Sequence, residues 1–225
     1  NVTVTNNYGK EDRVTFNGLT KGCTYIIYSD ATLKKKISTF TAKSASQTVT
    51  VKQLGSKAGS IYIVAGKSGC LSSKAAKVTY KAEQLPAIPA KNVSIANNIG
   101  TDKIAFKGLT KGFTYTVYSD RGLKKKIASF TATGKTKTVS VKQIGAKAGA
   151  VYIVVSKSGY AASKAAKITY KAQPTATVSG KKVKVTNSKK KDTIKMTGLK
   201  KGTVYVIYKD AKKKTKIASF KATGS

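Results

Sequence analysis

The sequence has no histidine, no tryptophan, one methionine and two cysteines in 225 residues. Without histidine it lacks the base that activates a serine or cysteine nucleophile, and it lacks the imidazole ligand that zinc sites commonly use. Its eight acidic residues are too few and too scattered for a calcium cage or for the paired carboxylates of a glycosidase. We therefore expect a protein that is not an enzyme and that needs neither a cofactor nor a metal.

The scarcity of acidic residues leaves a large positive excess, because 44 lysines and arginines give a formal net charge of +36. Only Arg13 and Arg121 are arginines, so lysine carries nearly all of this charge. Lysine is a hydrated point charge on a flexible stem, which suits a diffuse polyanion, whereas arginine suits bidentate recognition of bases or carboxylates. The composition predicts bulk electrostatic attachment to an acidic polymer rather than sequence-specific binding, since solubility alone does not require so one-sided a charge.

Long apolar runs are also missing, although 40% of the residues are hydrophobic. We therefore expect no membrane span. The chain opens directly on a strand pattern at Asn1, with no signal peptide before it, and we interpret it as a processed product or an excised piece.

Internal repetition is the strongest positive signal in the sequence. The segment GLTKGCTYIIYSD begins at Gly18, returns as GLTKGFTYTVYSD from Gly108 and returns again as GLKKGTVYVIYKD from Gly198, a period of 90 residues. Each full period holds seven short runs with the alternation or β-branched content of strands. In the first period these runs are residues 2–5, 13–17, 24–29, 36–42, 48–52, 60–65 and 74–81. The predicted fold class is all-β, a tandem of seven-stranded immunoglobulin-like or fibronectin III-like β-sandwiches.

The period divides the chain into two complete repeats and a half. Repeat 1 is expected at 1–82 and repeat 2 at 91–172, and residues 181–225 copy only the first four strands. Residues 83–90, with Pro86 and Pro89, are predicted to form an extended, rather stiff linker, and residues 173–180 a second one. The half repeat is interpreted as cut from a longer array; the alternative is self-association, in which strands of another molecule complete it.

A tyrosine just past a glycine corner can bury its ring while its hydroxyl bonds back to the backbone of the corner. Two corners of this kind are predicted in each full repeat and one in the half repeat. The tyrosines are Tyr25, Tyr62, Tyr115, Tyr152 and Tyr205.

The two cysteines both lie in repeat 1. Cys23 begins the third strand and Cys70 lies in the loop between the sixth and seventh strands, at the same end of one sheet in a sandwich of this kind. Their counterparts Phe113 and Tyr160 would suit the same contact as an aromatic pair. We predict a Cys23–Cys70 disulfide if the chain is extracellular; the alternative is two unrelated buried thiols.

Aspartates and lysine clusters recur in register. Asp30, Asp120 and Asp210 end the third strand, and Asp12, Asp102 and Asp192 precede the second. We expect turn chemistry, in which the carboxylate caps backbone N–H groups, and a lysine isopeptide bond is the alternative. The predicted polyanion-binding lysines fall on the connections beside these turns; the alternative is that they form an ordinary solvated face. They are Lys34, Lys35, Lys36, Lys124, Lys125, Lys126, Lys189, Lys190, Lys191, Lys212, Lys213, Lys214 and Lys216.

These motifs together resemble the immunoglobulin-like repeats of surface-layer and other cell-wall-associated proteins of Gram-positive bacilli. The matching segments are VTVTNN from Val2, the acidic step at Asp12, GLTKGCTYIIY from Gly18 and QLGSKAGSIYI from Gln53. The resemblance implies an extracellular, non-enzymatic structural module of a surface layer or cell wall. The many lysines depart from that pattern and put an ordinary spacer role in doubt.

The composition adds acidic cell-wall polymers, such as teichoic acids, as the expected partners. One alternative is non-specific binding of nucleic acid, for example in an extracellular DNA matrix. Most tyrosines are expected at core or corner positions, which leaves no stacking platform for bases. The other alternative is an accessory carbohydrate-binding domain or adhesin stalk, which the lack of tryptophan weakens.

Overall fold

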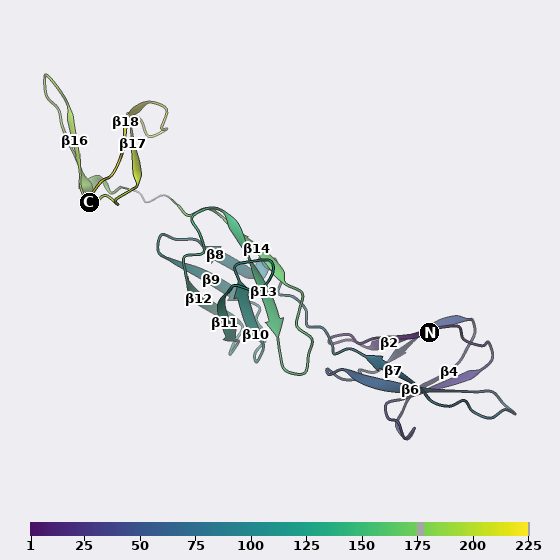
Figure 1. Ribbon diagram of the computed structural model, residues 1–225. Helices are drawn as coiled ribbons and strands as arrows, with labels where there is room; N and C mark the ends of the chain where they lie inside the picture. Colours follow the sequence, from purple (N-terminus) through teal and green to yellow (C-terminus); the bar gives the residue numbers. More distant parts are fainter. Residues whose placement is uncertain (175–177, 225) are drawn as a thin grey trace. The chain divides into compact units, whose positions relative to one another are not determined.

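The structure, a computed structural model, describes residues 1–174 and 178–224 (Figure 1). Its regular structure consists of strands and two short 3-10 helices. The chain divides into one compact unit of residues 1–174 and a second unit that begins at residue 175. Residues 175–177 of the expected second linker, and Ser225 at the end of the half repeat, lie outside the described residues.

Repeat 1 is a sandwich of two antiparallel sheets. The first sheet has the order β1-β2-β5 and the second the order β4-β3-β6-β7. Alternation decides which side chains face the core, as in β2, where Val14 and Phe16 are buried and Thr15 is not. The strand bounds are β1 (Val2–Thr5), β2 (Asp12–Asn17), β3 (Thr24–Tyr28), β4 (Lys36–Thr41), β5 (Ser46–Val51), β6 (Gly59–Gly66) and β7 (Ala76–Tyr80).

Repeat 2 has the same two sheets, β12-β9-β8 and β11-β10-β13-β14. In both repeats the fourth strand pairs with the third, whereas in immunoglobulin constant domains it joins the sheet of the first, second and fifth strands. The predicted fold class, tandem all-β sandwiches, is therefore confirmed in its fibronectin III-like form. The bounds are β8 (Val93–Ala96), β9 (Thr101–Lys107), β10 (Thr114–Tyr118), β11 (Lys126–Thr131), β12 (Thr136–Lys142), β13 (Gly149–Ser156) and β14 (Ala166–Tyr170), with the 3-10 helix η1 (Ala90–Asn92) before β8.

Residues 83–90, expected to be a linker, are tied to both repeats. Leu85 and Ile88 are buried in the core of repeat 2, and Gln84 forms an isolated bridge with Ala161. The backbone N–H of Glu83 donates to the Ser56 carbonyl of repeat 1 at 3.0 Å. The buried residues of the two repeats nevertheless form two separate clusters, which share no strand.

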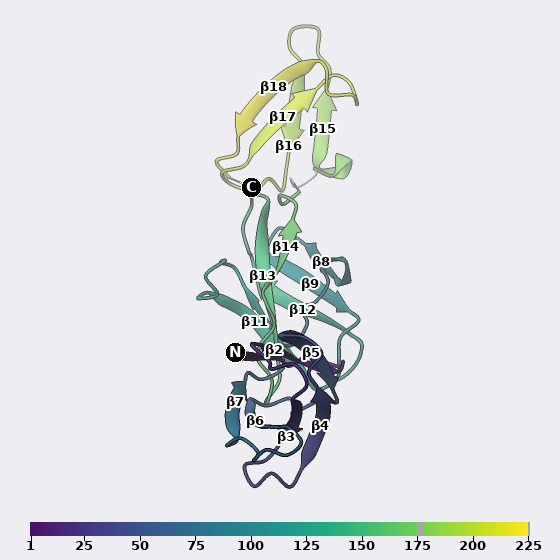
Figure 2. The same cartoon turned by 90° about the vertical axis from the view of Figure 1, so that its right-hand side faces the viewer.

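The second unit contains two separate hairpins, β15 (Val183–Thr186) with β16 (Thr193–Met196) and β17 (Val204–Tyr208) with β18 (Lys216–Lys221), after the 3-10 helix η2 (Gly180–Lys182) (Figure 2). Val185 is 59% exposed and Ile217 57% exposed. Their counterparts in repeats 1 and 2 lie against a core that the fifth to seventh strands help to close. The described residues of the second unit therefore form half of a sandwich with its apolar side open.

Candidate polyanion-binding surface

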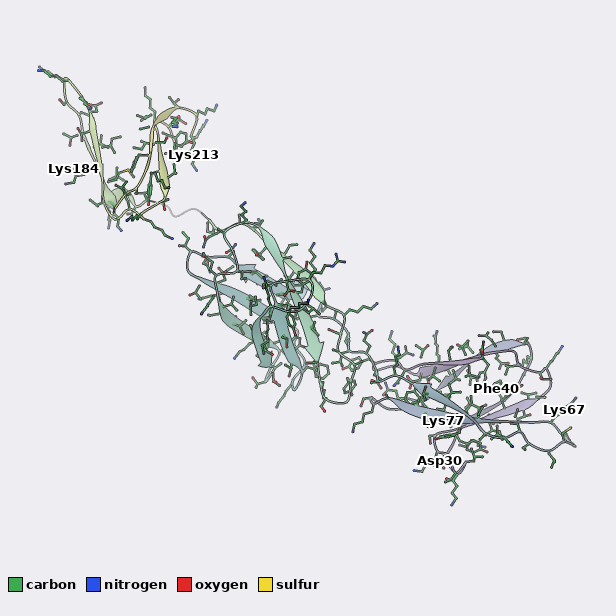
Figure 3. The ribbon with its side chains drawn as sticks, viewed as in Figure 1. Asp30, Phe40, Lys67, Lys77, Lys184 and Lys213 are labelled. Atoms are coloured by element: carbon green, nitrogen blue, oxygen red, sulfur yellow. The ribbon has the colours of Figure 1, made fainter. Side chains whose placement is uncertain are left out.

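The loop between β3 and β4 is ordered by one carboxylate. Asp30 accepts hydrogen bonds from the backbone N–H of Lys35 at 2.6 Å, from that of Lys34 at 3.2 Å, and from the Thr32 hydroxyl (Figure 3). Leu33 takes a left-handed conformation, with φ of 57°, so that the chain can turn back toward Asp30. The loop therefore keeps its shape through main-chain bonds and leaves its lysine side chains free.

The same loop recurs in repeat 2 and in the half repeat. Asp120 accepts from the backbone N–H of Lys125 at 2.6 Å, and Asp210 accepts from that of Thr215 at 2.8 Å. The residues at the left-handed position are Leu123 and Lys213, each with φ of 56°. The expected turn chemistry of these aspartates is confirmed by these bonds.

Hydrogen bonding keeps these three carboxyl groups charged. The Thr32 hydroxyl is the largest cause that lowers the pKa of Asp30 below its ordinary value. The backbone N–H of Lys125 does the same for the pKa of Asp120, and that of Lys214 for the pKa of Asp210. Each loop thus holds one fixed negative charge at its base while its lysines lie on the outside.

All of the predicted polyanion-binding lysines are exposed. Most of them lie on the connection between the third and fourth strands of their repeat, where Lys213 of the half repeat is labelled in Figure 3. Residues 189–191 lie instead on the connection between β15 and β16, at the same end of the half repeat as the β17–β18 connection (Figures 1 and 2). The half repeat therefore gathers two of the clusters at one end.

Three of the five predicted corner tyrosines have corner geometry. The hydroxyl of Tyr25 accepts from the backbone N–H of Thr20 at 3.0 Å, and that of Tyr115 accepts from Thr110 at the same distance. The Tyr205 hydroxyl accepts at 2.8 Å from the corresponding N–H in the half repeat. The rings of these tyrosines stack on a phenylalanine of the neighbouring strand, as Tyr25 does on Phe40 with centroids 5.5 Å apart.

Tyr62 and Tyr152 lie elsewhere than the prediction placed them. Tyr62 stands between the buried Ile61 and Ile63, so its side chain lies on the outer face of β6 by strand alternation. The tyrosine at this corner comes from the last strand instead, because the Tyr80 hydroxyl donates to the Leu54 carbonyl at 3.4 Å. Tyr170 lies in the same way against Gly149 in repeat 2.

The outer face of the larger sheet of repeat 1 carries a row of lysine and tyrosine side chains. Tyr28 of β3 is in register with Tyr62 of β6 on one side and, past a one-residue register shift in β4, is paired with Lys36 on the other. Tyr62 is in register with Lys77 of β7, which is labelled in Figure 3. Residues opposite each other on neighbouring strands share a face. We name the series Lys36–Tyr28–Tyr62–Lys77 the tyrosine–lysine row.

Repeat 2 carries the same row on the same strands. Its members in order are Lys126, Tyr118, Tyr152 and Lys167. In both rows the tyrosines are half-buried and the lysines are exposed. The half repeat keeps one pair of the row, Tyr208 with Lys216. Our sequence prediction missed Tyr28, Tyr118, Lys77 and Lys167, although their recurrence after 90 residues was a signal that could have found them.

The predicted Cys23–Cys70 disulfide is absent, because both cysteines are free. Gly66, the last residue of β6, already pairs with Thr24, and Cys70 follows four residues later in an exposed turn whose first residue, Lys67, is labelled in Figure 3. Cys70 is therefore carried beyond Cys23, which lies half-buried before β3. This prediction is corrected.

The counterparts of the cysteines in repeat 2 do form the expected aromatic contact. The rings of Phe113 and Tyr160 have centroids 6.5 Å apart, and Tyr8 of repeat 1 lies edge-on to both rings. The Lys157 ammonium lies 5.0 Å from the Phe113 centroid. The two positions are therefore filled by an aromatic pair in repeat 2 and by two free thiols in repeat 1.

The aspartates at the start of the second strand, Asp12 in β2, Asp102 in β9 and Asp192 just before β16, cap backbone groups, as expected. Asp12 is fully buried and accepts from the backbone N–H groups of Asn7, at 2.7 Å, and Leu54, at 2.6 Å. Asp102 makes the same pair of bonds, and Asp192 makes the first of them, at 3.1 Å. Asp12 and Asp102 thus join the turn after the first strand to the corner after the fifth, and Asp192 holds the turn alone, so the role of these carboxylates is structural.

Glu83 is buried close to Asp12. Burial, and then the charge of Asp12, raise the pKa of the Glu83 carboxyl above its ordinary value. In repeat 2 the same position holds Gln173, whose side-chain amide donates to the Asn98 carbonyl. The Gln173 amide is uncharged and makes a hydrogen bond at this position, whereas an ionised Glu83, buried beside Asp12, lowers the stability of the fold at neutral pH.

Residues 1–174 and 178–224 contain neither a membrane-spanning helix nor a cluster of metal ligands. No helix there is both long and apolar enough to cross a membrane. No cluster of three or more acidic residues or cysteines is placed there to hold a metal ion.

Comparison with known proteins gave matches in structure alone. No protein-family model matches the sequence, and no curated protein matches it either. A two-domain fibronectin type III segment of chicken tenascin aligns with a TM-score of 0.46 at 13% identity, covering 76% of this chain and 98% of its own. The chicken interferon gamma receptor alpha chain aligns with a TM-score of 0.46 at 7% identity, covering 77% of this chain and 97% of its own.

A third match has a lower TM-score. The BSP domain of a biofilm associated protein aligns with a TM-score of 0.28 at 16% identity and covers 78% of this chain and 30% of its own. Likenesses at these scores decide nothing about function, and the strand order alone identifies the architecture. The fold is fibronectin III-like.

Proposed function

We propose that this chain is a non-enzymatic, extracellular structural module of a bacterial surface layer or cell wall that attaches to acidic envelope polymers. The observation that carries the proposal is the repeated lysine loop, by which we mean the connection between the third and fourth strands together with the lysine that begins the fourth strand (residues 29–36, 119–126 and 209–216). In both repeats and in the half repeat one aspartate side chain accepts hydrogen bonds from the backbone of the loop, so the lysine side chains are not needed for its shape. Because the aspartate bonds to the backbone of the loop, the lysine ammonium groups remain available to a partner.

The charge balance supports a polymer rather than a small ligand. The net charge of +36 extends over both repeats and the half repeat, and each of them presents its own lysine cluster. A chain of phosphates can engage several clusters at once, and each engaged charge releases counterions, so affinity accumulates along the polymer. Teichoic acids have this chemistry, which makes them the polymer class that we propose.

The test is a pull-down on purified Gram-positive cell wall, before and after chemical removal of teichoic acid. We expect the full chain to bind intact wall and to lose most binding once the acidic polymer is removed. A variant with Gln at Lys34, Lys35 and Lys36 should bind intact wall more weakly. Undiminished binding to stripped wall would show that the peptidoglycan, and not an acidic polymer, is the ligand.

A further inference from the structure

The tyrosine–lysine row has a definite layout of charge and rings. Its tyrosines lie on β3 and β6, the two central strands of the sheet, and its lysines lie on β4 and β7, the two edge strands. Neighbouring strands lie about 4.8 Å apart, so the row extends roughly 14 Å across the sheet. Aromatic surface therefore lies in the middle of the face, with a cation at either side.

The edges of the sheet add further positive charge and no negative charge. Lys74 lies three residues before Lys77 on the side of β7, and both are exposed. The sequences of β3, β4, β6 and β7 contain no aspartate or glutamate. The same holds for β10, β11, β13 and β14, beside which Lys164 and Lys167 take the corresponding places. Asp30 and Asp120 follow Tyr28 and Tyr118 by two residues, in the loops beyond the sheet, where their carboxylates are held by backbone N–H groups. The strands of the face themselves are therefore free of negative charge and attract a polyanion.

This layout discriminates between polyanions. Polyphosphates have charge but no rings, and acidic polysaccharides carry the charge on the sugar ring itself. In a single-stranded nucleic acid the charged backbone lies beside the flat bases, so its phosphates can follow a lysine edge while its bases turn inward. Sheets whose aromatic side chains stack on unpaired bases, flanked by basic residues, bind single strands in this way.

We propose that the tyrosine–lysine row of repeats 1 and 2 is a stacking platform for unpaired bases of single-stranded nucleic acid. The inference rests on the proposed polyanion binding, because Lys36 and Lys126 belong both to the rows and to the lysine loops. It adds single-stranded nucleic acid, bound at the rows, to the teichoic acids proposed for the lysine loops. The binding is without base sequence preference, since every base has a face that can stack on tyrosine and the row contains no side chain that reads base edges.

The experiment measures the full chain by fluorescence anisotropy against two 20-nucleotide oligomers of equal charge, one of thymidine and one abasic throughout. We expect the thymidine oligomer to bind at least about fivefold tighter, because a stacked base contributes roughly 5- to 150-fold. Equal affinity of the wild-type chain for both oligomers would overturn the proposal without any variant. A sodium polygalacturonate competitor as effective as the thymidine oligomer would assign the row to sugar rings and overturn it too.

Variants then locate the effect on the row. Replacing Tyr28, Tyr62, Tyr118 and Tyr152 with Thr, a good strand residue on an outer face, should abolish the preference for bases and leave affinity for the abasic oligomer unchanged. The matched variant with Phe at the same positions keeps the rings and should keep the preference. If the Thr variant still prefers bases, the platform lies elsewhere and the proposal fails.

The two proposals fail in different ways. Substitution of Lys34, Lys35 and Lys36, together with Lys124, Lys125 and Lys126, by Gln should weaken binding of both oligomers. If abasic binding is unaffected by this change, the attachment through lysine loops is wrong, whatever the tyrosines do. If abasic binding weakens while thymidine has no advantage in the wild-type chain, the loops bind polyanions and the stacking platform is refuted.

Discussion

The lysine loop of repeat 2 offers a quantitative test of electrostatic attachment. We predict that replacing Lys124, Lys125 and Lys126 with Gln flattens the dependence of affinity on salt without unfolding repeat 2. The fold should survive because Asp120 binds backbone N–H groups, which glutamine keeps, and because all three side chains are exposed. Only the released counterions should change.

The magnitude follows from the number of charges removed. Each lysine that neutralises a polymer charge adds about 0.7 to 0.9 to the slope of log affinity against log salt, taking nucleic acids as the guide. Three lysines that all engage should therefore change the slope by about 2 to 2.7. Over a fourfold rise in salt, from about 50 to 200 mM, the wild-type chain should lose roughly 20 to 40 times more affinity than the variant.

The assay is titration of fluorescently labelled linear polyphosphate at several salt concentrations, because this polymer has charge and no rings. A matched control removes the same charge elsewhere in repeat 2, with Gln at the exposed Lys135, Lys137 and Lys147. We expect the control to change the slope less, because these side chains do not share one loop. Arginine at the loop positions should preserve binding, since a diffuse polyanion requires charge more than shape.

Three results would refute the reasoning. Parallel salt dependences for the wild-type chain and the loop variant would show that these lysines touch no polymer. Equal flattening by the loop variant and the control would show that the total charge attracts the polymer and that the loops have no special part. A loss of binding on lysine-to-arginine substitution would indicate a shaped pocket.

Three further predictions concern the fold. Glu83→Gln should raise the melting temperature at pH 7. The pKa of Glu83 is raised in the folded state, so the stability that its protonated form contributes is fully present below the unfolded pKa of about 4.5 and is lost as the pH rises through the folded pKa. The difference in melting temperature between variant and wild type should therefore vanish in acid. A thiol reagent should titrate both cysteines of the unreduced protein, Cys70 faster than Cys23, and reductant should leave the melting temperature unchanged; a protected pair would contradict the structure. Tyr115→Phe should destabilise repeat 2 by about 1 to 3 kcal/mol, because a backbone N–H loses its acceptor, whereas Tyr152→Phe on the outer face should cost little; equal denaturation midpoints for the two variants would be evidence against the corner bond.

Much of the architecture could be predicted from local patterns. The 90-residue period and the alternation within each strand determined the repeats and the strand positions to within a few residues. The aspartates were predictable because an acid at a strand end beside a turn has few roles other than capping backbone N–H groups. In each case the information lies within a few neighbouring residues or in their recurrence.

The cysteine pair shows where local patterns stop. Placing Cys23 and Cys70 at the same end of one sheet was sound, because β3 and β6 are antiparallel neighbours. The disulfide nevertheless depends on where β6 stops and on how its loop turns, and neither is encoded in strand propensity. Cys70 lies four residues past Gly66 in an exposed turn, and strand pairing alone does not determine whether its Cα atom comes within the roughly 7 Å of Cys23 that a disulfide requires.

Tyr62 shows how two valid patterns can compete. The glycine before it suggested a corner, whereas the alternation of Ile61, Tyr62 and Ile63 requires the tyrosine to face outward once both isoleucines are buried. Burial prevails, because turning Tyr62 inward would expose two isoleucines, each of which gains about 1.5 to 3 kcal/mol from the core. The position of Tyr62 beside Tyr28 is a further step that only strand pairing determines. The argument against a base-stacking platform depended on tyrosines being buried, so it fails for the outward tyrosines, and the row of rings between lysines has to be tested as a surface.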